Sequence, residues 1–437
     1  MTAMSHQVGR LLELVSPRVG VVRSLSRVPR GVDEPSPPIL YHAQLSHFDF
    51  RRGKLLERSA FGKGFSEDEA MGSALGEAIE RYCAHHADTR AIRGAKAAAL
   101  DTPFLSPAEC VLYSEPQYAR KSFPYARWDE QTETSWLPGV EFPGNTDVLL
   151  PAALVYMNYS GPNNDEYFCP STSNGMAAGP DLDSAVLAGL CELVERDGFL
   201  IHWMNRLTAP EVEFAGGTAG AIREYYARFG VEVRVFDLST DVPAAVMMAV
   251  ALTRRDRGPA AVVGLGCHPS PEKALVKALG EVCQVRPGEV KRFLETDPAK
   301  LPQLPEAVKT LEDHSGYFFS PERLPELAFL LDNGRRRRLE EMPDRSQGSL
   351  CADLHNLVAG LRGAGCRVAF VDVTSPDIQP YPVRAVRTFA TGLQPIHFGY
   401  GEEHLGGRRL FEAPRRLGYG GGRRSESELN PCPHPLP

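Results

Sequence analysis

The 437-residue sequence lacks any run of apolar residues long enough to span a membrane, and its N-terminus has neither a long apolar core nor a signal-peptide cleavage site. Its nine cysteines include no Cys-x-x-Cys pair, which argues against a zinc framework of that type and a thioredoxin-like motif. The net charge of −7 lacks the positive excess of a nucleic-acid-binding surface. The usual phosphate-binding loop, GxxxxGK[ST], is also absent. These absences predict a soluble cytoplasmic protein that binds neither nucleic acid nor membrane.

One helical pattern occurs three times, and its copies align on Glu77, Glu192 and Glu281. Eleven residues before each of these stands a residue that can cap a helix; these residues are Ser66, Asp181 and Ser270. The side chain of a capping Ser or Asp accepts a hydrogen bond from a backbone N–H of the first turn. Three residues after each glutamate stands a second acidic or amide side chain; these are Glu80, Glu195 and Gln284. The pattern predicts three helices, each with a polar pair on one face.

If the three helices pack around one centre, up to five carboxylates and one amide gather there. Carboxylates that share a small volume raise one another's pKa unless cations neutralise them. Clustered oxygen ligands favour Mg²⁺, which usually shares its coordination with substrate phosphates. The alternative is that each glutamate lies on a solvated face, as in the i, i+4 pairs Glu77–Arg81 and Glu192–Arg196. The threefold recurrence favours a Mg–nucleotide site.

These segments closely resemble the YcaO family. They match its Sx₃Ex₂E element at 73–80, its Ex₂ER element at 192–196 and its Ex₂Q element at 281–284, in order and with sensible spacing. The resemblance covers roughly residues 55–405. It implies a mixed α/β (α+β) YcaO fold, with internally repeated helix and strand units around a central site for ATP and Mg²⁺.

The resemblance also implies roles for individual residues. Four carboxylates are the expected Mg²⁺ ligands, directly or through water: Glu77, Glu80, Glu192 and Glu195. Arg196 is the expected phosphate contact, because a guanidinium binds phosphate oxygens bidentately. Five further residues are candidates for holding the nucleotide or its ligands: Lys63, Ser73, Asn174, Glu281 and Gln284. For Lys63, which stands in a Gly-Lys-Gly turn, an ordinary surface lysine is an equal alternative.

A second duplication supports the α/β assignment. Residues 225–240 and 361–375 both run from a helix end through Gly into a strand, with Asp237 matching Asp372. Further strands are predicted at 244–252 and 260–267. The Arg run at 335–338 is predicted to be a solvated loop or the start of a helix, not a phosphate-binding patch.

The motifs divide the chain into an N-terminal extension (1–58), a catalytic ATP-binding domain (59–412) and a linker with a Pro-rich tail (413–437). The extension is too short for a leader-peptide-binding module, which many YcaO enzymes carry. A separate leader-binding partner protein is therefore expected to capture the precursor peptide.

The tail ends in NPCPHPLP, with proline at every second position. By composition alone it is equally a disordered tail of polyproline character. In azoline-forming YcaO cyclodehydratases, however, a Pro-rich end lies in the active site. The resemblance therefore implies a catalytic role for the carboxylate of Pro437, together with Arg196.

The expected activity is ATP-dependent cyclodehydration of Cys, or of Ser or Thr, in a ribosomal precursor peptide. Two alternatives stay open: a thioamide-forming YcaO enzyme, against which the Pro-rich tail speaks, and a non-catalytic nucleotide-binding scaffold. A dehydrogenase that oxidises the rings is a further candidate partner. A second copy of the chain is another, since homodimers are common in the family.

Overall fold

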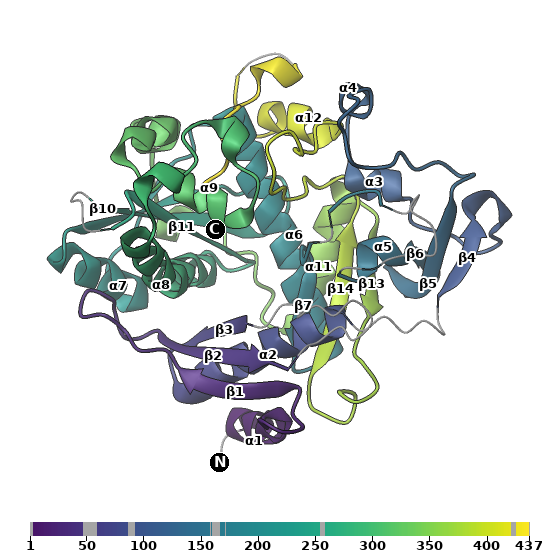
Figure 1. Cartoon of the computed structure of the whole chain (residues 1–437), viewed down its shortest axis with the longest axis horizontal. Helices are drawn as coiled ribbons and strands as arrows, with labels where there is room; N and C mark the ends of the chain where they lie inside the picture. The colour runs from purple at the N-terminus through teal and green to yellow at the C-terminus, as the bar shows by residue number, and fades with distance from the viewer. Residues whose placement is uncertain are drawn as a thin grey trace. The chain divides into compact units, whose positions relative to one another are not determined.

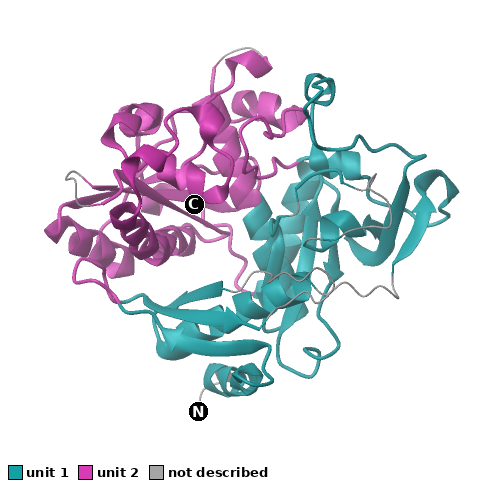
Figure 2. Cartoon of the chain, in the orientation of Figure 1, with its two compact units in different colours: residues 1–29, 37–193, 350–392 teal, residues 30–36, 194–349, 393–437 magenta. Residues whose placement is uncertain are grey.

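The computed structural model describes residues 3–46, 59–85, 92–157, 159, 167–170, 172–253, 258–420 and 425–436. The chain forms two compact units, each built from several segments (Figure 2). Unit 1 comprises Met1–Pro29, Pro37–Leu193 and Leu350–Gly392; unit 2 comprises Arg30–Ser36, Val194–Ser349 and Leu393–Pro437. Both units mix helices with sheet, which confirms the α/β assignment. The predicted boundaries at 58/59 and 412/413 do not coincide with these units and stay predictions.

Unit 1 contains a three-stranded antiparallel sheet in the order β1-β2-β3 (Figure 1). Its strands are β1 (Val22–Arg27), β2 (Ile39–Leu45) and β3 (Ser59–Gly64). Helix α2 (Glu67–Ala84) packs on β2 and β3, and α1 (Ala3–Leu11) packs on α2. Alternate residues of β3 are buried, which is the period expected of a strand with one covered face.

A second sheet of unit 1 has the order β4-β5-β13-β14-β7, with β6 paired to β5. These strands are β4 (Arg93–Lys96), β5 (Glu133–Phe142), β6 (Thr146–Pro151), β7 (Met176–Gly179), β13 (Val368–Asp372) and β14 (Arg384–Ala390). Helix α11 (Leu350–Gly363) packs on β13. Short helices α3 (Pro107–Val111), α4 (Glu115–Tyr118) and α5 (Ala152–Val155) complete the unit.

Unit 2 contains a five-stranded sheet in the order β11-β10-β9-β8-β12. Its strands are β8 (Glu211–Glu213), β9 (Val231–Asp237), β10 (Ala245–Thr253), β11 (Ala261–His268) and β12 (Arg336–Arg338). Helix α7 (Gly217–Arg228) packs on β9, and α8 (Pro271–Glu295) packs on β10 and β11. Shorter helices are α9 (Leu311–Tyr317), α10 (Ala328–Leu331) and α12 (Arg408–Arg416).

The three predicted helices are α2, α6 (Leu182–Asn205) and α8, and each directly follows a strand. Ser66 caps its helix as predicted and forms a capping box with Glu69, and Asp181 accepts a hydrogen bond from the backbone N–H of Ser184 at 2.8 Å. Ser270 occupies the cap position of α8, but its side chain makes no capping hydrogen bond. The predicted helix start is therefore confirmed there, but the predicted side-chain hydrogen bond is wrong; Pro271 at the first helical position is a further start signal.

The second duplication is also confirmed. Helices α7 and α11 end just before Gly230 and Gly365, whose φ angles of 76° and 94° suit glycine, and strands β9 and β13 follow. Asp237 and Asp372 make equivalent hydrogen bonds at the ends of β9 and β13. Each carboxylate accepts a hydrogen bond from the backbone N–H two residues on, at 3.0 and 2.9 Å.

The Arg run at 335–338 is not a loop or a helix start, so that prediction is wrong. Three of its residues form β12, an edge strand that pairs in parallel with β8. Arg336 pairs with Glu211 at 2.9 Å and Arg337 with Asp237 at 2.8 Å. Acidic partners on neighbouring segments neutralise the run, and a charged edge strand resists further pairing.

Among the described residues, no helix combines the length and apolarity that a membrane crossing requires.

Close approach of α8 to β11 depends on Gly264. A Cβ added there would lie 2.6 Å from Ala278 O and from Val282 N on the helix. We therefore expect Gly264→Ala to lower the free energy of unfolding by about 2 kcal/mol, because overpacking a tight interface displaces backbone. Urea unfolding measures the change. Gly363→Ala is the control, since nothing lies within 4 Å of its added Cβ. Equal midpoints for both variants and the wild type would contradict this packing argument.

Candidate functional site

Helix α2 presents the predicted acidic stripe in unit 1. Ser73 is exposed, whereas Glu77 and Glu80 are partly buried. Arg81 lies beside both carboxylates: its Nη2 is 3.7 Å from Glu77 Oε1 and its Nε is 3.9 Å from Glu80 Oε1. Arg81 therefore makes the i, i+4 pair with Glu77 that the alternative interpretation predicts, and it also lies close to Glu80. Lys63 lies partly buried on β3, the strand against which α2 packs.

Glu192 belongs to the same unit and lies near a buried arginine of β14. Helix α6 can approach β14 closely because residue 189 is glycine; a Cβ there would lie 2.7 Å from Thr388 Oγ1. Arg387, the preceding residue of β14, is 8% exposed. The charges of Glu192 and of Glu80 both act on its guanidinium. Within unit 1, two of the predicted metal ligands, from α2 and α6, thus lie within electrostatic range of one buried cation.

The guanidinium of Arg387 is a buried positive charge that offsets the negative charges of Glu192 and Glu80. Burial lowers its pKa to about 10, and the carboxylates of Glu192 and Glu80 oppose that shift. Its Nη1 donates a 2.8 Å hydrogen bond to the carbonyl of Thr172, and among the described residues no acceptor reaches its buried Nε. A guanidinium in this position stabilises two ionised carboxylates that would otherwise repel each other.

Asn174 contributes a buried polar atom that no donor among the described residues reaches. It lies two residues from the Thr172 carbonyl that Arg387 binds, and its backbone N–H donates a hydrogen bond to the Thr172 hydroxyl at 3.3 Å. Its side-chain Oδ1 is buried and meets no donor within the described chain. Buried carbonyl oxygens in native proteins are normally satisfied, so an orphaned one indicates a place for a ligand.

The donor set fits Mg²⁺ held together with a nucleotide. Among the residues that the structure describes, no three His, Cys, Asp or Glu side chains are arranged to hold a metal by themselves. Mg²⁺ does not require such a cage, because it usually takes one or two carboxylates together with substrate phosphates and water. The carboxylates of Glu80 and Glu192, with the orphaned oxygen of Asn174, are hard oxygen donors of the required kind.

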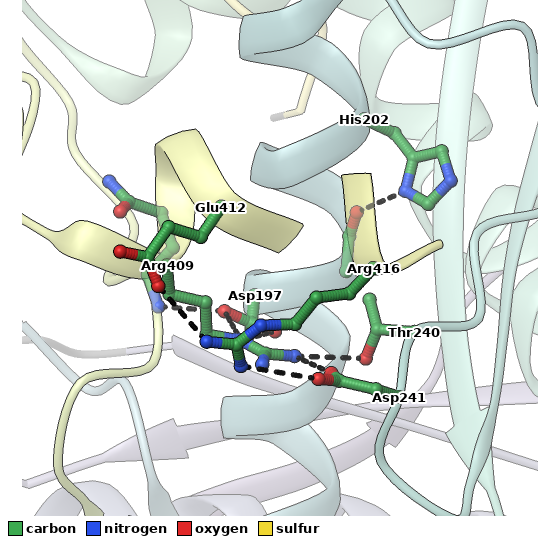
Figure 3. A network of polar contacts seen from close by, with 9 residues as sticks. Asp197, His202, Thr240, Asp241, Arg409, Glu412 and Arg416 are labelled. Atoms are coloured by element: carbon green, nitrogen blue, oxygen red, sulfur yellow. Dashed lines mark hydrogen bonds and ion pairs between the residues drawn. The ribbon is translucent and has the colours of Figure 1, made fainter. Parts of the chain in front are cut away.

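In unit 2, α6 carries Glu195 and Arg196, both partly buried, and then the fully buried Asp197. Arg409 Nε donates to both carboxylate oxygens of Asp197, at 3.0 and 2.9 Å. The same guanidinium reaches Asp241 at 2.5 Å through Nη2, as Figure 3 shows. Burial raises the pKa of the Asp197 carboxyl, an effect that the Arg409 guanidinium opposes. This ion pair fixes α6 at the residue that follows Arg196.

Helix α12, which carries Arg409, is tied to α6 at a second point. Pro414 lies inside α12 and has no N–H, so the carbonyl of Leu410 loses its helical partner. Asn205, the last residue of α6, donates its Nδ2 to that carbonyl at 2.9 Å. The side chain replaces the missing backbone donor and joins the two helices.

Helix α8 carries the third predicted pair, Glu281 and Gln284, within unit 2. The Oε2 of Glu281 accepts a hydrogen bond from the backbone N–H of Leu265 at 2.6 Å, so this carboxylate also anchors α8 to β11. Pro287 has no N–H, so the carbonyl of Cys283, next to Gln284, has no donor within the helix. Arg30 Nη2 supplies a replacement at 3.0 Å. The repeated pattern therefore has a structural use in this copy.

The Pro-rich tail packs along α6 within unit 2 and is not a disordered end. Asn430 Nδ2 donates to the carbonyl of Trp203 at 3.2 Å, and Trp203 Nε1 donates to the carbonyl of Cys432 at 3.0 Å. The His434 ring lies 5.7 Å from that of Phe199, centre to centre. The tail thus runs antiparallel to α6, from the end of the helix back toward Arg196.

Pro437 lies outside the described residues, and its predicted role stays a prediction. Of the other expected site residues, Glu77, Glu80 and Glu192 lie with Arg81 and Arg387 in unit 1. Arg196 lies with the tail in unit 2.

Sequence reasoning did not identify Arg387, Asp197 and Arg409 as part of the site. A signal existed for the first two, because each is a charged residue inside an otherwise apolar strand or helix face. Such a residue requires a buried partner. The partner itself, 212 residues further along the chain for Asp197, left no comparable signal.

We expect Asp197→Asn to lower the free energy of unfolding by about 3 kcal/mol, because it removes one partner of a buried ion pair and leaves Arg409 poorly compensated. Urea unfolding monitored by circular dichroism measures the loss. Glu115→Gln, which breaks the exposed pair with Arg127, is the control and should leave the midpoint unchanged. An Asp197→Asn midpoint equal to that of the wild type would show that the pair does not stabilise the fold.

Comparison with known proteins places the chain in a family. The model of the YcaO cyclodehydratases, described as ATP- and Mg²⁺-binding, matches residues 61–394. An uncharacterized protein of Methanothermobacter thermautotrophicus is 30% identical over 356 residues, which are 79% of this chain and 84% of that protein.

Two solved heterocyclases are similar to the chain in structure. A heterocyclase in complex with substrate and cofactor has a TM-score of 0.82 and 27% identity, over 99% of this chain and 57% of its own. The heterocyclase TruD has a TM-score of 0.67 and 25% identity, over 84% of this chain and 50% of its own. The chain thus spans little more than half the length of these two proteins. Because the family model matches most of the sequence, the chain belongs to the YcaO cyclodehydratases, enzymes that bind ATP and Mg²⁺.

Proposed function

We propose that the protein catalyses ATP-dependent cyclodehydration of Cys residues, and of Ser or Thr, in a ribosomal precursor peptide. The products are thiazolines or oxazolines, ADP and phosphate. A separate leader-binding protein is proposed to deliver the peptide. The similarity to a heterocyclase solved with its substrate and cofactor supports this substrate class.

The proposed reaction has three steps. The side-chain thiol or hydroxyl of the substrate adds to the preceding amide carbon, and the amide oxygen becomes a tetrahedral oxyanion. That oxygen attacks the γ-phosphorus of ATP and displaces ADP. Loss of the phosphorylated oxygen as phosphate, with the amide nitrogen forming the C=N bond and releasing its proton, leaves the azoline. Phosphorylation is needed because an oxide leaves poorly, whereas phosphate leaves readily.

Protein residues contribute positioning and charge to this reaction. Phosphoryl transfer is catalysed mainly by placing the reactants in line and by neutralising charge on phosphate oxygens. Arg196 is proposed to bind the phosphates, and the Asp197–Arg409 pair next to it restricts its movement. Glu77, Glu80, Glu192 and Glu195 are proposed to hold Mg²⁺, which supplies charge neutralisation when bound.

The course of the tail along α6 is the observation that carries the proposal. Asn430, Cys432 and His434 contact α6 at Trp203 and Phe199, so that each step along the tail approaches Arg196. The described part of the tail therefore runs back along α6 in the direction of the turn that carries Arg196. This supports a role for the Pro437 carboxylate as a base, or as the group that orients the reacting atoms.

We expect Glu195→Ala and Arg196→Ala each to abolish peptide-dependent ATP turnover, because the first removes a proposed ligand of Mg²⁺ and the second removes the proposed cationic contact to the phosphates. Phosphate release measures turnover, and circular dichroism verifies the fold. Glu295→Ala, at an exposed position of α8, is the control and should turn over ATP as the wild type does. Full turnover in both site variants would reject this site assignment.

We further expect incubation with a Cys-containing precursor, its leader-binding partner, ATP and Mg²⁺ to remove one water per modified residue, as read by mass spectrometry. A variant lacking residues 433–437 should bind ATP but form no ring. Exchange of oxygen for sulfur, given a sulfide source, would instead identify a thioamide-forming enzyme. An unchanged mass with a competent partner would favour a scaffold that only binds nucleotide.

A further inference from the structure

Three buried histidines enclose the end of the tail in unit 2. They come from α9, from the segment after β14 and from the tail itself: His314, His397 and His434, which are 1%, 4% and 0% exposed. The His434 ring stacks on His314 with centroids 3.9 Å apart and an interplanar angle of 14°. The centroid of the His397 ring lies 5.0 Å from that of the His434 ring. We refer to these three residues as the histidine cage.

The alternating prolines explain why a side chain has to hold this segment. Pro433 and Pro435 have no N–H, so the tail cannot be held by a ladder of backbone donors. Carbonyl groups remain as acceptors: Cys432 O receives the Trp203 indole N–H, and His434 O lies 2.9 Å from His314 Nδ1. The side-chain donor in this stretch is His434 Nε2, which donates to His397 O at 2.8 Å.

The second ring nitrogen of His434 is available as an acceptor. Because Nε2 carries the proton that His397 O accepts, Nδ1 of the neutral ring is a bare lone pair. It is buried, and no donor among the described residues reaches it. Burial and the neighbouring groups His314, His397 and Arg196 keep the pKa of His434 well below its usual range, so the ring is neutral.

We propose that His434 is a positioning residue: it locks the tail in the histidine cage and so holds its described residues along α6. This inference rests on the proposed function, because it assigns the locked tail a part in the dehydration. His434 itself makes no contact with the reacting atoms in this scheme. It acts through the tail, whose course along α6 its ring and backbone hold.

Cys432 offers a direct readout of tail anchoring that does not depend on catalysis. Its thiol is 5% exposed in the docked tail, and it would become accessible to an alkylating reagent if the tail were released. Alkylation of Cys432 by iodoacetamide, followed by peptide mass spectrometry, therefore reports the fraction of released tail in the full-length protein without substrate.

The decisive variants are His434→Ala and His434→Gln. His434→Ala removes the donor and the stacking ring, so we expect alkylation of Cys432 to become about tenfold faster and kcat for ring formation to fall about tenfold, as loss of one buried hydrogen bond allows. The dissociation constant for ATP should stay unchanged, because Asp197 and Arg409 hold Arg196 independently of the tail. Glutamine retains a side-chain N–H near the position of Nε2 and should restore both values toward the wild type.

The control is His355→Ala, at an exposed position of α11, which should behave as the wild type. Slow alkylation of Cys432 in His434→Ala would overturn the anchoring role, and fast alkylation with an unchanged kcat would overturn the role in the reaction. If the wild type binds ATP but forms no ring, the proposed function fails. The alkylation rates then still decide whether His434 anchors the tail.

Discussion

The burial of Asp197 is the constraint on which the functional half of α6 depends. A carboxylate that is fully removed from water must be paired and hydrogen-bonded, since the cost of burying it alone is several kcal/mol. The backbone N–H of Gln394 and the guanidinium of Arg409 meet this requirement. Both come from the last segment of the chain, which therefore has to fold back onto α6. Its return places the tail on the same helix that carries Arg196.

The need of buried backbone carbonyls for a hydrogen-bond donor explains other contacts that local sequence patterns do not reveal. A proline inside a helix frees the carbonyl four residues before it, and a buried carbonyl needs a donor. Arg30 donates a hydrogen bond to the carbonyl that Pro287 leaves without a helical donor. Asn205 does so for the carbonyl that Pro414 leaves without one. In the tail, where alternate residues lack an N–H, side chains hold the backbone through its carbonyls. Proline thus shifts the work of hydrogen bonding from the backbone to side chains distant in sequence.

In the acidic helices, arginines of the protein itself offset the repulsion between neighbouring carboxylates. Glu77 and Glu80 share Arg81, and Glu80 and Glu192 share the buried Arg387, so the protein itself supplies cations to carboxylates that would otherwise repel. Part of the neutralisation expected of a metal is therefore present in the chain. A bound Mg–nucleotide would add to the positive charge that these arginines supply. This is compatible with Mg²⁺, which needs only one or two protein ligands.

Local physical signals in the sequence determined the three repeated helices, two of their caps, the paired helix–Gly–strand units and the acidic positions, because each depends on residues within a few places of one another. The resemblance carried by those motifs determined the family. Tertiary structure alone decided that Arg387 lies with Glu80 and Glu192, that the Arg run forms an edge strand, and that the tail docks on α6. These outcomes depend on pairs far apart in the chain, such as Trp203 and Cys432, which are separated by 229 residues. No periodicity or spacing encodes such a pair, since burial and the need to satisfy each polar group select the partner only when the chain is folded.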